Sequence, residues 1–166
     1  MSLYPQPGRI LRLLGFALLL NLVIQTSVSA DDQIKVVYHA DFSDPRRFSA
    51  MLTSINNMAN YYENEFLEYD IRIVFVAHGI RFVTDDRLDG TPFQEDAELA
   101  ERRANIKGRL MSLHEVRGIQ LELCDITRSQ SNLSADKLYE GVESVPSGVV
   151  RLAELQNQGF AYIKIE

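Results

Sequence analysis

Three side chains in this sequence could do chemistry at sulfur: Cys124, His39 and His78. A cysteine thiolate is a strong nucleophile, and a nearby histidine can lower the thiol pKa and carry its proton. Asp125 follows the cysteine and opposes thiolate formation through its negative charge. These residue types predict nucleophilic chemistry at Cys124 with His39 or His78 assisting. The alternative is a buried structural cysteine, with histidines that bind backbone carbonyls.

A metal site is a second chemistry open to the same side chains. His39, His78 and Cys124 are acceptable ligands for zinc or copper, but they lie far apart in the sequence. They form none of the short paired spacings of structural zinc sites. The acidic segment 85–89 lacks the remaining ligands of a calcium loop. We therefore expect no metal and no cofactor.

Residues 1–30 have the features of a secretory signal peptide. Two arginines open the segment, an apolar stretch runs from Leu13 to Ile24, and small residues at 28–30 form a cleavage site. The stretch is shorter than the ~20 residues that span a bilayer, which disfavours an uncleaved membrane anchor. We expect cleavage before Asp31 and a periplasmic or secreted protein. An unpaired thiol in an oxidising compartment favours a functional cysteine.

The charge balance excludes two classes of partner. Residues 31–166 carry 15 basic and 23 acidic side chains, a formal charge of −8. Such a surface repels nucleic acid and anionic lipid, so we expect no nucleic-acid binding and no membrane contact after cleavage. The remaining 136 residues suit a single domain, and no linker or repeat divides them.

Apolar runs and helical patterns alternate along this domain. Strands are predicted at 34–38, 71–77, 119–124, 142–145 and 161–165. Helices are predicted at 45–65, at 95–113 and from 148 to a stop at Gly159. Loops are predicted at 80–93, with one short helical turn, and at 125–134. Strands interleaved with helices require right-handed crossovers. The fold class is therefore α/β, a three-layer sandwich with a mainly parallel five-stranded sheet.

This architecture predicts where the chemistry lies. Ligands of open α/β sheets bind in the crevice outside the carboxyl ends of the strands. His39, His78 and Cys124 each end a different predicted strand, so all three could share one edge of the sheet.

Several short blocks of the sequence resemble the DsrE/DsrF-like sulfur-relay family. They include Val37-Tyr38-His39-Ala40-Asp41, Val76-Ala77-His78-Gly79, the strand ending in Cys124 and Val145-Pro146-Ser147-Gly148-Val149. The likeness covers nearly all of residues 31–166. It implies a compact α/β domain that forms trimers or hexamers. It also implies that a cysteine at the position of Cys124 carries sulfur as a persulfide.

Two hypotheses of different classes follow. In the first, an exported sulfur-handling protein carries sulfane sulfur on Cys124 and exchanges it with a donor or acceptor protein. In the second, a non-catalytic oligomeric module binds a small ligand or a protein in the same crevice. Either would be a homo-oligomer, because Ile80, Phe82, Val83 and Phe93 are more apolar than a surface loop needs unless something covers them.

Overall fold

The computed structural model describes residues 33–166 as one α/β domain, and the predicted signal peptide lies outside the described residues. Its sheet has the strand order β4-β3-β2-β1-β5, and all four pairings are parallel. The strands are β1 (Ile34–Ala40), β2 (Tyr69–Phe75), β3 (Gln120–Cys124), β4 (Val142–Val145) and β5 (Ala161–Ile163). The α-helices are α1 (Pro45–Asn64), α2 (Ala97–Arg117), α3 (Asp125–Gln130) and α4 (Gly148–Asn157). Two 3₁₀ helices are η1 (Ala77–Phe82) and η2 (Ala135–Lys137).

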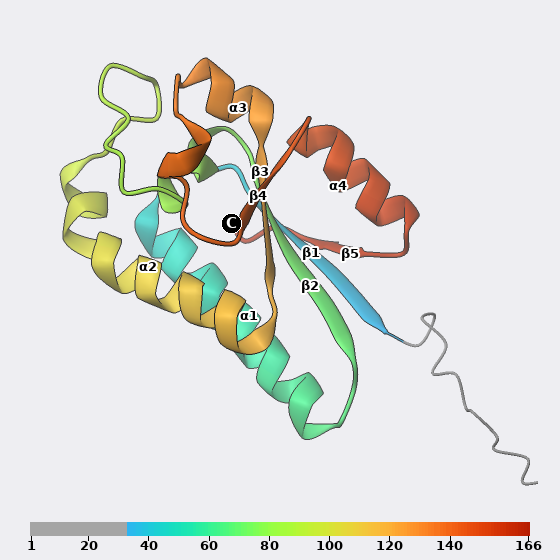
Figure 1. Cartoon of the computed structure of the whole chain (residues 1–166). Helices are drawn as coiled ribbons and strands as arrows, with labels where there is room; N and C mark the ends of the chain where they lie inside the picture. Colours follow the sequence, from blue (N-terminus) through green and yellow to red (C-terminus); the bar gives the residue numbers. More distant parts are fainter. Residues whose placement is uncertain (1–32) are drawn as a thin grey trace, which may run out of the picture.

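The predicted fold class is confirmed, and the two faces of the sheet are covered unequally. Helices α1 and α2 lie on one face, and α4 lies alone on the other (Figure 1). The large core forms under α1 and α2, from alternate residues of β2 such as Ile71, Ile73 and Phe75. The core under α4 has five buried residues: Val37, Val74, Leu152, Leu155 and Phe160. Apolar packing therefore holds α4 less extensively than it holds the helices opposite.

The helix boundaries follow from capping residues in the sequence. Asp44 accepts hydrogen bonds from the N–H groups of Arg46 and Arg47 and so starts α1 at Pro45, as predicted. Gly118 ends α2 in the left-handed conformation, with φ 68°, which glycine adopts without steric cost. The prediction of a polar loop directly after Cys124 is wrong, because the first six residues of that segment form α3. Its hydrophilic side chains give no apolar periodicity to detect.

The segment 80–93 differs from the expectation in a way that matters for assembly. Ile80, Phe82 and Val83 are buried in the core of the same chain, and Phe93 packs against that core. These side chains need no partner subunit to cover them. They therefore give no support to an oligomer.

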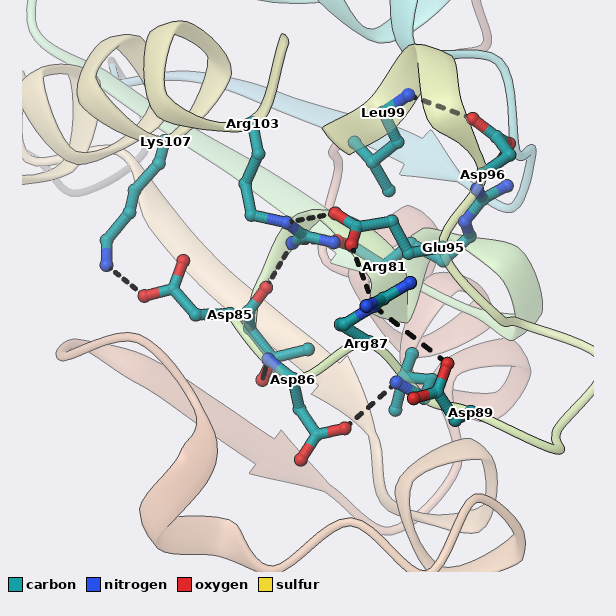
Figure 2. Close-up of polar contacts among 12 residues, drawn as sticks. Arg81, Asp85, Asp86, Arg87, Asp89, Glu95, Asp96, Leu99, Arg103 and Lys107 are labelled. Carbon is teal, nitrogen blue, oxygen red and sulfur yellow. Dashed lines mark hydrogen bonds and ion pairs between the residues drawn. The ribbon is translucent and has the colours of Figure 1, made fainter. Parts of the chain in front are cut away.

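Polar contacts hold this segment in place (Figure 2). Arg103 of α2 donates to the Glu95 carboxylate at 2.7 Å, to the Arg81 carbonyl at 3.1 Å and to the Thr84 carbonyl. One turn further along α2, Lys107 pairs with Asp85. Charged side chains thus add to the few backbone hydrogen bonds of this segment, and hydropathy does not reveal them.

Candidate functional site at the carboxyl edge of the sheet

Cys124 lies where two helices begin. It ends β3 and directly precedes α3, and the first turn of α4 lies against it. A Cβ atom placed on Gly148 would lie 3.0 Å from Cys124 Cβ and 2.6 Å from Val76 Cγ2. A side chain there would displace its neighbours. Glycine therefore allows the amino end of α4 to approach the cysteine closely.

Hydrogen bonds around the sulfur favour its thiolate form. Burial raises the pKa of Cys124, since only 4% of the residue is exposed. Hydrogen bonds from the backbone of Gly148 and Thr127, from the Thr127 side chain and from the backbone of Ile126 act in the opposite direction. Their sum leaves the pKa of Cys124 below its ordinary value. A lowered thiol pKa is typical of reactive cysteines, whereas burial is typical of inert ones, so the two features of Cys124 point in opposite directions.

Thr127 contributes to the site although it is not among the residues predicted from sequence. The side chain is buried, and its Oγ1 accepts a hydrogen bond from the Ala77 N–H at 3.1 Å. Because the hydroxyl oxygen is held by that N–H, its proton is free to point at the Cys124 sulfur. No composition or spacing signal marks Thr127, since its role depends on α3 forming directly after the cysteine.

Asp125 acts less strongly on the thiol than its sequence position suggests. Its carboxylate pairs with Arg128 at 2.6 Å, and Ser129 donates to it as well. The Arg128 guanidinium holds the pKa of Asp125 below its usual range. Arg128 therefore offsets most of the negative charge that Asp125 brings near the thiol.

His39 lies on the same face of the sheet as Cys124 but on a more distant strand. Strand β2 separates β1 from β3, so at ~4.8 Å between strands the two backbones are about 10 Å apart. His39 Nδ1 is 2.8 Å from the Tyr162 hydroxyl, and its Nε2 is 3.9 Å from Asp41. Burial lowers the pKa of His39 more than Asp41 raises it. A neutral imidazole at this distance could serve a ligand at the edge but does not touch the thiol.

His78 does not end a strand, because β2 stops at Phe75 and His78 belongs to η1. Its ring meets Phe93 edge-on, with centroids 5.2 Å apart. Among the described residues, its buried Nδ1 has no hydrogen-bond partner. The neighbouring Ala77 N–H contacts Thr127, which connects η1 to the cysteine through one hydroxyl. The assisting roles of His39 and His78 stay predictions.

Residues 33–166 contain no cluster of three or more His, Cys, Asp or Glu side chains that could hold a metal ion. The third histidine, His114, is structural. Its Nδ1 contacts the Ile119 carbonyl at 2.9 Å, and its ring packs where Gly141 has no side chain.

The two helices next to the thiol expose apolar side chains. Ile126 of α3 and Val149 and Val150 of α4 are each more than half exposed. A hollow of about 280 Å³ is lined by Pro146, Ser147 and Val150 and by the charged Arg151 and Glu154. A larger hollow of about 650 Å³ lies elsewhere, between α2 and the segment 136–140, and is lined mainly by charged side chains.

A sequence model of the DsrE/DsrF-like family matches residues 34–165, which is nearly the whole described domain. The chain belongs to the DsrE/DsrF-like family. The resemblance read from short blocks of sequence is thereby confirmed at the level of the family.

Three known proteins from different organisms are similar to this DsrE/DsrF-like domain. An uncharacterized protein of Aquifex aeolicus is 28% identical over 130 residues, 78% of this chain and 55% of the relative. The chain thus spans about half the length of that relative. A protein of unknown function from Methanobacterium thermoautotrophicum has a TM-score of 0.61 and 26% identity, covering 80% of this chain and 99% of its own. The ychN protein of E. coli shares the fold, with a TM-score of 0.53, 19% identity and coverage of 80% and 100%.

Proposed function

We propose that this protein carries sulfane sulfur as a persulfide on Cys124 and passes it to a partner protein. The observation that carries the proposal is the set of hydrogen bonds from both adjoining helices to the buried sulfur. A sulfur carrier needs an ionised thiol, and these contacts lower the pKa of Cys124. Membership in the DsrE/DsrF-like family supports the same class of role.

The proposed transfer consists of two balanced exchanges. The Cys124 thiolate attacks a sulfur atom of a polysulfide, one sulfur–sulfur bond forms, another breaks, and a shortened polysulfide anion leaves. An acceptor thiolate then attacks the outer sulfur of the persulfide. The bond to Cys124 breaks, the electron pair returns to the Cys124 sulfur, and the acceptor leaves as a persulfide. No external oxidant or reductant is required.

Mass spectrometry of the intact protein tests this function. After treatment with polysulfide, we expect the mass of the wild type to rise by one or more sulfur atoms and to return when a reducing thiol is added. Cys124→Ser should show no adduct while keeping the same circular dichroism spectrum. A wild type that takes up no sulfur, although a small alkylating agent modifies its thiol, would contradict the proposal.

One observation favours a second candidate, a non-catalytic binding module. Only 4% of Cys124 is exposed, and the two adjoining helices expose apolar Ile126, Val149 and Val150, as in a site that holds a ligand or protein. The mass experiment separates the two functions. An alkylated but never sulfurated thiol supports the module.

We further propose that the mature protein starts at Asp31, is exported to the periplasm or secreted, and forms a trimer or hexamer. No helix within residues 33–166 has the length and apolar character to cross a membrane. Exposed Phe66 and Val116 offer apolar surface for subunit contacts. Native mass spectrometry of the protein from the soluble extracytoplasmic fraction should give three or six chains, each starting at Asp31. A single chain, or one starting at Met1, would contradict this.

A further inference from the structure

A buried ion pair connects α4 to the strand that carries the cysteine. Arg151 of α4 donates to Glu122 of β3 through Nε at 2.6 Å and Nη2 at 2.9 Å, a two-point contact. The Glu122 side chain is 3% exposed. Burial raises the pKa of Glu122, but Arg151 and Arg72 lower it further, so the carboxylate is ionised.

Both partners of this pair are close to the thiol in sequence and in space. Glu122 lies two residues before Cys124, so both side chains project from the same face of β3. Arg151 lies three residues after Gly148, which places both in the first turns of α4. The ion pair therefore joins the strand to the helix close to the contact between Gly148 and the sulfur.

The apolar support of α4 is too small to make this connection redundant. Five buried residues form the whole apolar cluster between α4 and the sheet within residues 33–166. Its helical members, Leu152 and Leu155, lie from the middle of α4 onward, whereas Val74 and Val76 are the apolar neighbours of Gly148 at the amino end. Arg151 adds a charged contact at this amino end, which must approach Cys124.

We propose that Glu122 and Arg151 are positioning residues for Cys124: their ion pair fixes the first turn of α4 so that the Gly148 N–H stays on the sulfur. The inference rests on the proposed function, because it concerns the reactivity of the same thiol. The other charges that adjoin the thiol, Asp125 and Arg128 of α3, pair with each other and leave α4 free.

Arg72 supplies a matched control. It also donates to Glu122, at 3.0 Å, but it comes from β2 and has no covalent link to α4. Arg72→Met and Arg151→Met each leave Glu122 with one guanidinium partner, although Arg72→Met also removes the guanidinium from Asp70 and from the Phe160 ring. A purely electrostatic effect through Glu122 would therefore be similar in both variants, whereas a positioning effect would be confined to Arg151→Met.

The experiment is a pH titration of the thiolate by its ultraviolet absorbance, with the spectrum of the matching Cys124→Ser protein subtracted to remove tyrosine. For Arg151→Met we expect the thiolate fraction at neutral pH to fall roughly threefold to tenfold, because the Gly148 hydrogen bond to the thiolate is weakened without being lost completely. Arg72→Met should change it by less than about twofold. Circular dichroism confirms that each variant is folded.

Equal shifts in the two variants, or no shift in Arg151→Met, would overturn the positioning role. If Arg151→Met does not fold, Arg151→Lys replaces it, because lysine keeps the charge but loses the two-point contact. It should shift the titration in the same direction by a smaller factor, and an unchanged titration would overturn the proposal. The titration needs no sulfur donor, so its outcome is independent of whether polysulfide loads the protein.

Discussion

Gly79→Ala is expected to lower the free energy of unfolding by about 3 kcal/mol or more. A Cβ atom on Gly79 would lie 2.0 Å from the Ala40 carbonyl oxygen and 3.0 Å from its carbon. Both are backbone atoms at the end of β1, so no side-chain rotation can relieve the contact. The added methyl group must separate η1 from the sheet edge that carries the candidate site.

Gly108→Ala is the matched control. It makes the same chemical change, but it is expected to raise the free energy of unfolding, whereas Gly79→Ala lowers it. Gly108 lies inside α2, and a Cβ atom added there would meet no neighbouring atom within 4 Å. Alanine should raise the free energy of unfolding by about 1 kcal/mol through its higher helix propensity. Urea denaturation of both variants measures the contrast. A Gly79→Ala protein as stable as the wild type would show that η1 can move away from β1 at little cost.

Arg103→Met is expected to destabilise the protein by about 3 kcal/mol and to release the segment 84–95. The Arg103 side chain is 14% exposed, and that of its partner Glu95 is 9% exposed. Methionine would leave the Glu95 carboxylate with only the more distant Arg87 at 3.5 Å. It would also remove the Arg103 donor from the Arg81 carbonyl and from the Thr84 carbonyl, which keeps the Tyr139 hydroxyl at 3.0 Å (Figure 2).

Lys107→Met is the control for Arg103→Met. It also removes one positive charge from α2, one turn further along the helix. Lys107 pairs with Asp85 at the surface, where both side chains are more than a third exposed. Such a pair contributes less than about 1 kcal/mol. Hydrogen exchange should show faster exchange across 84–95 in Arg103→Met alone. Equal losses of stability in the two variants would contradict the assignment of Arg103 as the residue that holds the loop.

The elements that the sequence predicts well are those whose signals are local. The Asp44 cap, the Gly118 stop and the β4 strand depend on residues next to one another in the chain. The strand before His78 ends two residues earlier than predicted, because its apolar run continues through Val76 and Ala77 into the turn. Periodicity cannot show where the backbone leaves the sheet.

The candidate site could be predicted only in part. The position of Cys124 at a strand end follows from the sequence, and β-sheet topology then brings it to the carboxyl edge. The sequence does not specify strand order, so the distance imposed by β2 between His39 and Cys124 could not be foreseen. Gly148 reaches the sulfur through a tertiary contact from α4, and Thr127 reaches it through the local helix α3, which the sequence does not predict.

The burial of Cys124 has a consequence for how a partner could recognise its loaded state. With 4% of the residue exposed, the bare sulfur presents almost nothing to a protein that docks on Ile126, Val149 and Val150. A sulfur–sulfur bond is about 2 Å long, so a persulfide would extend the side chain outward by roughly the radius of one atom. The cargo itself would then form part of the docking surface, and an acceptor could distinguish a charged carrier from an empty one by shape alone.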